Sequence, residues 1–147
     1  MTERKLTAYL AGPINDCTDE ECKDWRERMK TEMPEVNFLD PMRRDYRDFE
    51  TEETAIEIVE NDKKDIDDSD VILVYHDRPS VGTSMEVLYA FERDMFVLTI
   101  ACTGKPLSPW ILYHSTKIVE SLEEAIEVLK PIVEEFTGWA EMEEDDL

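Results

Sequence analysis

Val71-Ile-Leu-Val-Tyr75, near the middle of the chain, is a continuous run of apolar residues. A strand that is apolar on both faces is typical of a parallel sheet, because helices cover both sides of such a sheet. A second apolar run covers residues 95–101, and shorter strand patterns occur at 5–11, 36–39 and 117–119. We therefore expect a parallel sheet of about five strands with flanking helices.

Helical patterns separate the expected strands. A helix is predicted over 19–33, where four apolar side chains share one face: Cys22, Trp25, Met29 and Met33. The next helix is expected over 51–68, with Thr51 as its N-cap and three side chains facing inward: Ile56, Val59 and Ile66. Alternating strands and helices define the α/β class, and we expect a doubly wound sheet of the Rossmann or flavodoxin type.

Two further helices complete the pattern. One follows Gly82 and runs to about residue 94, and the last covers 121–136 with a single apolar stripe. Gly138 is expected to stop the last helix, so that all four glycines would lie at element ends. We expect one domain over residues 1–137, followed by an acidic, solvated tail over 138–147.

The composition restricts the classes of function. The chain of 147 residues has a formal net charge of −21, from 37 acidic and 16 basic residues. Nucleic acids and anionic membranes attract clustered Lys and Arg, so we expect neither as a partner. A small anionic ligand remains compatible with this charge, because local groups govern binding inside a pocket.

The cysteines and the N-terminus indicate an ordinary cytoplasmic protein. Three cysteines without a CxxC pair argue against a disulfide framework or a zinc site. The first residues are charged and then only briefly apolar, unlike a signal peptide, and no apolar run is long enough to span a membrane. We expect a soluble, cytoplasmic protein.

Motifs for the common cofactors and nucleophiles are missing from the sequence. It contains no GxGxxG, GxxxxGK[ST] or GxSxG, and only two histidines, His76 and His114. We therefore expect no cofactor and no metal. The remaining option is carboxylate chemistry near the segments that follow the strands, at 12–17, 76–84 and 102–109.

Three residues are candidates for that chemistry. Glu86 lies in the first turn of a helix, where the helix N-terminus favours an ionised carboxylate, although it could simply complement the helix dipole. Asp62 lies within a helix among other acids, a pattern that more often marks a solvated face. Tyr9 comes just before Gly12, so its hydroxyl could reach the same edge, but a core tyrosine is an equally good interpretation. Glycosidic chemistry uses two carboxylates, and these residues would supply them with an orienting hydroxyl.

Four segments together resemble the nucleoside 2-deoxyribosyltransferase superfamily: Tyr9-Leu-Ala-Gly-Pro-Ile14, the single Asp62, Asp68-Ser-Asp-Val-Ile-Leu-Val74 and Gly82-Thr-Ser-Met-Glu-Val-Leu-Tyr-Ala90. The resemblance covers about residues 6–136. It implies a retaining double displacement on an N-glycosidic bond, in which Glu86 attacks C1′, Tyr9 holds the Glu86 carboxylate and Asp62 protonates the departing base. Substrate contacts are then expected at Gly12, Asn15, Ser80, Gly82, Met85 and Ser108.

Position 80 bears on the substrate. Superfamily transferases that act on free nucleosides carry an Asp there, whereas Ser80 is similar to the 5′-monophosphate N-glycosidases, in which a hydroxyl meets the phosphate. Leu107-Ser108-Pro109 resembles a loop by which a neighbouring subunit supplies a second serine, which implies a homodimer or higher homo-oligomer with shared sites. Asn15 replaces an Arg of those glycosidases, so the missing charge would have to come from Arg43, Arg44 or Arg78.

We therefore expect an N-glycosidase that cleaves a (2′-deoxy)nucleoside 5′-monophosphate into a base and a sugar 5-phosphate. The first alternative is a nucleoside 2-deoxyribosyltransferase that exchanges bases on a free nucleoside. The second is a non-catalytic protein that binds and sequesters a nucleotide, which would have no need for a paired nucleophile and acid.

Overall fold

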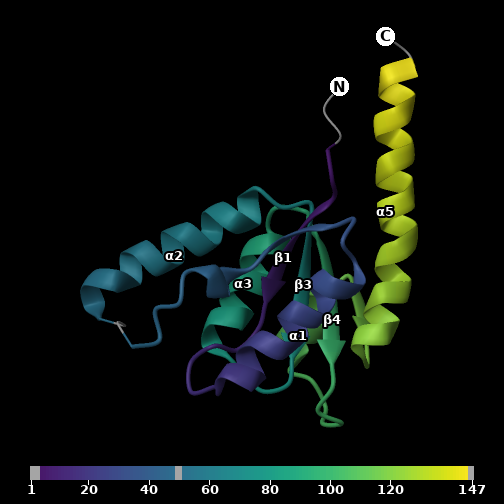
Figure 1. The fold of residues 1–147 in the computed structure, drawn as a ribbon. Coiled ribbons are helices and arrows are strands. Elements are labelled where there is room, and N and C mark those ends of the chain that lie inside the picture. Colours follow the sequence, from purple (N-terminus) through teal and green to yellow (C-terminus); the bar gives the residue numbers. More distant parts are fainter. Residues whose placement is uncertain (1–3, 49–50, 146–147) are drawn as a thin grey trace.

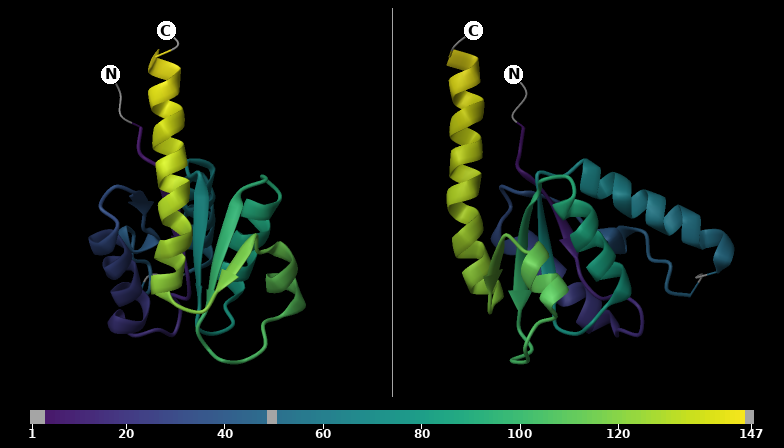
Figure 2. Two further views of the ribbon diagram at one scale, coloured as in Figure 1. Left: turned by 90° about the vertical axis from the view of Figure 1, so that its right-hand side faces the viewer. Right: turned by 180° about the vertical axis from the view of Figure 1, so that it is seen from behind.

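The chain folds as a parallel sheet between two layers of helices (Figures 1 and 2). A computed structural model describes residues 4–48 and 51–145, with side chains up to residue 138. The strands are β1 (Thr7–Ala11), β2 (Asn37–Leu39), β3 (Val71–His76), β4 (Phe96–Ala101) and β5 (Lys117–Val119). The helices are α1 (Asp19–Glu32), α2 (Glu52–Asp67), α3 (Val81–Phe91), α4 (Pro109–His114) and α5 (Leu122–Asp145), with a 3₁₀ turn η1 (Pro41–Arg43). All strand pairs are parallel in the order β2-β1-β3-β4-β5, which confirms the expected doubly wound α/β class.

The central strand explains the apolar run at 71–75. β3 pairs with β1 on one side and with β4 on the other, so that Leu73 lies between Leu10 and Leu98. Val71, Ile72, Leu73 and Val74 are buried because helices cover both faces of the strand. Burial of this kind is the main stabilising contribution of the fold, at about 25 cal/mol per Å² of apolar surface.

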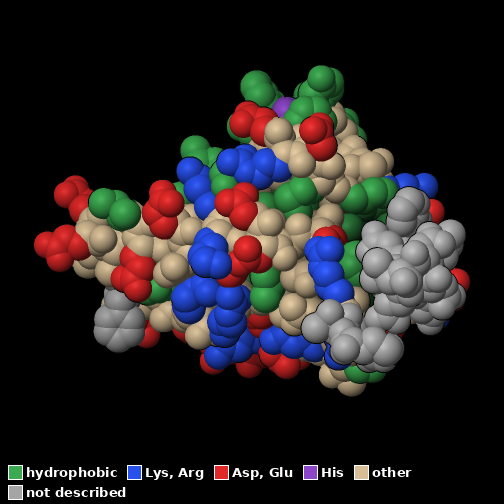
Figure 3. Space-filling model, turned by 90° about the horizontal axis from the view of Figure 1, so that it is seen from above, with side chains coloured by type: hydrophobic (Ala, Val, Ile, Leu, Met, Phe, Trp, Pro, Cys, Tyr) green, Lys and Arg blue, Asp and Glu red, His purple; other side chains and the backbone are tan. Residues whose placement is uncertain are grey.

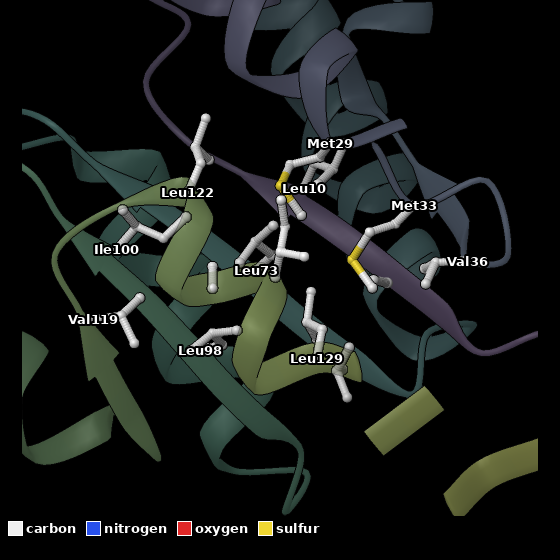
Figure 4. Packing of buried hydrophobic residues seen from close by; sticks show 14 of the residues in the cluster. Leu10, Met29, Met33, Val36, Leu73, Leu98, Ile100, Val119, Leu122 and Leu129 are labelled. Atoms are coloured by element: carbon white, nitrogen blue, oxygen red, sulfur yellow. The ribbon is translucent and has the colours of Figure 1, made fainter. Parts of the chain in front are cut away.

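Each face of the sheet packs against its own helices. On one face, α1 and α5 cover the strands, with Met29, Leu122 and Leu129 in the core (Figure 4). On the other face, α2 contributes Ile66, α3 contributes Val87 and Ala90, and α4 contributes Ile111. Tyr9 belongs to this second face and is fully buried.

The helix starts follow the capping chemistry of the sequence. Thr51 is the N-cap of α2, as predicted, and Thr18 forms a capping box with Glu21 at the start of α1. The predicted inward face of α1 is confirmed, because its Cys22, Trp25 and Met29, together with the C-cap Met33, are buried.

The predicted inward face of α2 is wrong for two of its three residues. Ile66 is buried, but Ile56 is 73% exposed and Val59 is 47% exposed. The reason is geometric: α2 projects beyond the sheet, so its first turns have no layer of the fold beneath them (Figure 2). The sequence pattern predicts the helix correctly, but it does not show how far the sheet extends beneath that helix.

Two glycines do not mark element ends. Gly82 lies inside the first turn of α3, and α5 continues through Gly138 to Asp145. A terminating glycine adopts a positive φ, but among the described glycines only Gly104 does so. A glycine within a helix costs roughly 1 kcal/mol relative to alanine, which the good helix formers around Gly138 can offset. In the described part of the chain, no helix is long and apolar enough to span a membrane.

Candidate active site

A cleft of about 560 Å³ opens at the carboxyl edge of the sheet. It lies where the strand order reverses between β1 and β3, the position at which doubly wound folds bind ligands. The loop after β1, the segment around η1, the side of α2 and the start of α3 form its walls. The cleft therefore joins four parts of the chain that are far apart in sequence.

Glu86 lines this cleft, and the buried Tyr9 lies behind it. Glu86 lies in the second turn of α3, not in the first as predicted, because the helix begins at Val81 and not after Gly82. The Tyr9 hydroxyl donates a hydrogen bond to the Glu86 carboxylate. Tyr9 is held by the packing of β1 within the sheet, so its hydroxyl is a fixed donor. Burial, followed by the charge of Glu86, raises the pKa of Tyr9 and keeps this hydroxyl protonated.

Asp62 brings a second carboxylate to the cleft from the side of α2. Burial raises the pKa of Asp62 to about 6, while Arg44 opposes the increase. Burial also raises the pKa of Glu86 to about 8; the Tyr9 hydrogen bond opposes this increase and the charge of Asp62 adds to it. Since the two acids interact, they titrate as a pair, and burial raises the pKa of both.

The start of α3 presents hydrogen-bond donors to the cleft. Ser80 is the N-cap, and its hydroxyl oxygen accepts a hydrogen bond from the Thr83 amide at 3.3 Å. Val81 and Gly82 line the cleft in the first turn, where helix amides lack partners within the helix. Thr83 is 3% exposed, and its hydroxyl has no hydrogen-bond partner within the described residues. A helix start with these groups favours an anion.

Gly12 allows the loop after β1 to pass close to α1. A Cβ atom at this position would lie 2.7 Å from Cζ2 of Trp25, which is too close for any side chain. Beneath the loop, the fully buried Arg26 donates to the carbonyl oxygens of Leu10 and Gly12, at 3.3 and 3.1 Å from Nη2. This contact holds the loop that forms one wall of the cleft.

The structure brings together most of the residues singled out in the sequence. Glu86, Asp62, Gly12, Asn15, Ser80 and Gly82 all line the cleft, and Tyr9 lies directly behind Glu86. Met85 is 67% exposed on α3 and Ser108 is the N-cap of α4, and neither lines the cleft of its own chain.

Of the three arginines that could replace the missing charge, Arg44 and Arg78 line the cleft and Arg43 does not. Arg78 is paired with Glu21 and Asp77. Thr83 and Tyr46 also line the cleft, although neither is a candidate from the sequence. Tyr46 carries no motif signal, and Thr83 could have been found only from its position within Gly82-Thr-Ser-Met-Glu86. Among the described residues, no group of His, Cys, Asp and Glu could hold a metal ion.

The fold and the cleft define an α/β protein with a carboxylate site at the switch point of its sheet. The model of the nucleoside 2-deoxyribosyltransferase family matches residues 8–140, and the chain therefore belongs to this family. Members of the family are enzymes that act on nucleosides or nucleotides.

Solved structures share the fold at low sequence identity. A 2-deoxyribosyltransferase from Bacillus psychrosaccharolyticus is 18% identical with a TM-score of 0.68, over 81% of this chain and 89% of that one. A conserved protein from Enterococcus faecalis V583 is 14% identical with a TM-score of 0.65, over 84% and 96%. The CMP N-glycosidase BcmB from Clostridium botulinum is 15% identical with a TM-score of 0.57, over 86% and 98%. No curated protein sequence matches the chain.

Proposed function

We propose that this protein is an N-glycosidase that cleaves a (2′-deoxy)nucleoside 5′-monophosphate into a free base and a sugar 5-phosphate. The observation that carries the proposal is the hydrogen bond from Tyr9 to Glu86 in a cleft that also holds Asp62. An ionised carboxylate as nucleophile and a second, protonated carboxyl group are the two components that a retaining glycosidase requires. The pKa values of both acids are raised, so the pair holds a proton, and the form that reacts has this proton on Asp62 with Glu86 ionised. A nucleotide-sequestering protein would not need such a pair.

The reaction proceeds in two displacements. In the first, a Glu86 carboxylate oxygen bonds to C1′ while the C1′–N bond breaks, and Asp62 gives its proton to the departing nitrogen. In the second, Asp62 accepts a proton from water as the water oxygen attacks C1′ and releases Glu86. Splitting the cleavage in this way lowers the barrier of each step. Tyr9 favours the ionised form of Glu86 throughout, because its hydroxyl donates to the carboxylate.

The start of α3 supports a phosphate at the sugar 5′ position. Ser80, the amides of Val81 and Gly82, and the unpartnered hydroxyl of Thr83 are neutral donors grouped at one helix N-terminus. Such a group stabilises an anion, whereas a carboxylate in the place of Ser80 would repel it. The CMP N-glycosidase BcmB, a structural neighbour, acts on a nucleotide of this kind.

The shared-site dimer remains part of the proposal. Ser108 starts α4 outside its own cleft, next to an exposed apolar face formed by α3 and α4. This face consists of Val81, Met85, Leu88, Phe91, Trp110 and Tyr113. A second copy that covers it would gain apolar burial and could bring its Ser108 toward the neighbouring phosphate site.

The test compares a matched nucleotide and nucleoside with the wild type and the Ser80→Asp variant. Aspartate is also a good N-cap, so the variant should fold. We expect the wild type to have a higher kcat/KM for the nucleotide. Ser80→Asp should lower that value by more than the roughly ten- to hundredfold that the loss of a charge-assisted bond predicts, because it also places a negative charge against the phosphate. Thr18→Asp, which adds the same charge at the exposed N-cap of α1, should change little.

The opposite preference would refute the phosphate assignment. If the wild type prefers the free nucleoside and transfers its sugar to an added base, the protein is a transferase and the roles of Ser80 and Ser108 are wrong. If it binds nucleotides without cleaving them, the catalytic proposal fails.

A further inference from the structure

A buried carboxylate holds two consecutive arginines next to the cleft. Asp65 lies one turn beyond Asp62 on α2, and its side chain is 8% exposed. Arg43 Nη2 contacts one Asp65 oxygen at 2.7 Å, and Arg44 Nη2 contacts the other at 2.6 Å. Hydrogen bonds between a guanidinium and a buried carboxylate are strong and directional, so both arginine side chains are held in place.

The two arginines differ in what else they touch. Arg44 lines the cleft, and its Nη2 atom lies 3.6 Å from Oδ1 of Asp62. The Nε atom of Arg44 is buried and has no hydrogen-bond partner in the described part of the chain. Arg43 lies outside the cleft and donates instead from Nη1 to the carbonyl oxygen of Asp40, at 2.8 Å. Arg44 therefore connects Asp65 to Asp62, whereas Arg43 does not.

We propose that Arg44, held by Asp65, is a positioning residue that orients Asp62 and stabilises its ionised form. The inference rests on the proposed function, in which Asp62 alternates between proton donor and proton acceptor. When Asp62 gives its proton to the departing base, a negative charge appears beside a guanidinium that is already in place. When Asp62 takes a proton from water in the second step, the same contact keeps its oxygen directed into the cleft. Arg44 itself stays protonated in both steps.

The electrostatic surroundings of Asp62 agree with this role. Burial raises the pKa of Asp62 to about 6, and Arg44 is the strongest opposing influence. Without Arg44, both the burial and the charge of Asp65 would act on Asp62 with less compensation. The other charged and titratable groups that interact with Asp62 come from three further elements: Arg26 on α1, Tyr9 on β1 and Glu86 on α3.

A direct contact between Arg44 and the substrate phosphate is the main competing role. The two roles predict different kinetics. A phosphate ligand would contribute to nucleotide binding and would matter little for a nucleoside. A residue that positions Asp62 would affect the chemical step equally for both substrates, with little change in KM.

The experiment compares Arg44→Met with Arg43→Met, because each variant removes one partner from the same Asp65. We expect similar losses of thermal stability in both. We expect kcat to fall about a hundredfold only in Arg44→Met, as for a misplaced catalytic group, with KM changed less than about threefold. The factor should be equal for nucleotide and nucleoside. Arg44→Lys, which keeps the charge but not the fork, should recover part of kcat.

A carboxyl titration gives a readout that does not depend on turnover. Carbon-13 NMR, with Asp62→Asn for assignment, should show the pKa of Asp62 about one unit higher in Arg44→Met than in the wild type. The kcat/KM profile should move to higher pH with it, because its apparent pKa values belong to the Asp62–Glu86 pair. Arg43→Met should show less than half of either shift.

Equal kinetics and equal titration in the two methionine variants would overturn the inference. So would a loss in Arg44→Met that is confined to nucleotides and expressed in KM, since that result would make Arg44 a phosphate ligand. A wild type that cleaves no nucleoside or nucleotide would instead refute the proposed function, and the titration would still report whether Arg44 and Asp62 interact.

Discussion

At the scale of single residues, Glu86 shows a conflict between stability and reactivity. Its pKa is raised to about 8 in the folded chain, mainly by burial, from an ordinary value of 4.5. A raised carboxyl pKa means that the fold favours the protonated form. The contribution of Glu86 to stability is therefore fully present below about pH 4.5 and is lost as the pH rises through 8.

Glu86→Gln should consequently abolish turnover and stabilise the fold at alkaline pH. The amide cannot ionise, so it avoids the cost of a buried negative charge and can keep a hydrogen bond with Tyr9. We expect a gain on the order of 2 kcal/mol at pH 8.5 and little or no gain at pH 4.5. Thermal unfolding at both pH values measures this difference, with Glu134→Gln on the exposed side of α5 as control. A gain that is equal at both pH values would show that the Glu86 pKa is not raised.

At the scale of elements, the two glycines at the cleft serve different purposes. A Cβ at Gly12 would meet Trp25, whose ring cannot move easily. The ring stacks on Tyr75, with the ring centroids 4.8 Å apart, and Cζ of Arg26 lies 4.6 Å from the ring centroid of Trp25. A Cβ at Gly82 would meet nothing within 4 Å. Gly12 is thus required by packing, whereas Gly82 keeps the start of α3 open to a ligand.

Gly12→Ala should therefore destabilise the protein by about 1–3 kcal/mol, as overpacking does. Gly82→Ala should leave the stability unchanged or raise it by up to about 1 kcal/mol, because alanine favours the helix. The same methyl group would stand in the cleft beside Ser80, so the KM for the nucleotide should increase. Urea unfolding and steady-state kinetics of both variants measure the two effects. A stable Gly12→Ala, or a Gly82→Ala with unchanged KM, would contradict this division.

The elements were predictable where burial produces a pattern. The apolar runs at 71–75 and 95–101 identified β3 and β4, because strands between two helix layers must be apolar on both faces. α4 was missed because its six residues are too few for a helical period and several of them are exposed. The prediction that the first turns of α2 are buried is wrong, because a helical pattern does not show where the sheet beneath the helix ends.

The site was predictable only in part, and for a physical reason. Tyr9 and Glu86 are candidates because of their positions near strand ends, but Asp62 looks like Asp65 in an acidic helix. The roles of all three residues come from the resemblance. The roles of Arg43 and Arg44 depend on the turn η1, which sends one side chain into the cleft and the other away from it. The sequence contains no pattern that tells which of two consecutive arginines in such a turn points into the cleft.

At the scale of the whole molecule, acidic, basic and hydrophobic side chains occupy different regions of the surface. Acidic side chains crowd the projecting end of α2, while Lys and Arg gather closer to the body (Figure 3). At physiological salt, the screening length for interactions between exposed charges is about 8 Å. The distant charges that make up most of the net charge of −21 therefore have little effect on a bound nucleotide. The local groups at the cleft decide binding. Hydrophobic side chains gather at a different edge of the molecule (Figure 3).

That edge, the exposed face of α3 and α4, should be the dimer interface. Trp110 and Tyr113 are each 72% exposed there, and an apolar face of this kind is covered in most soluble proteins. Trp110→Asp would place a charge in the interface and should give a monomer with reduced activity. Ile56→Asp changes a residue that is equally exposed, at 73%, but lies on α2, and it should remain dimeric. Light scattering after size exclusion measures both.

The assembly matters for function if Ser108 enters a neighbour's site, and mixed dimers test this point directly. Glu86→Ala lacks the nucleophile, and Ser108→Ala lacks the hydroxyl proposed to contact phosphate across the interface. In a mixed dimer, one of the two clefts would combine an intact Glu86 with a neighbour that carries an intact Ser108. Each mixed dimer should therefore have up to about half of the wild-type activity, and an equal mixture after random subunit exchange should have up to about a quarter. Activity that stays at the sum of the separate variants, or an active wild-type monomer, would show that each cleft works alone.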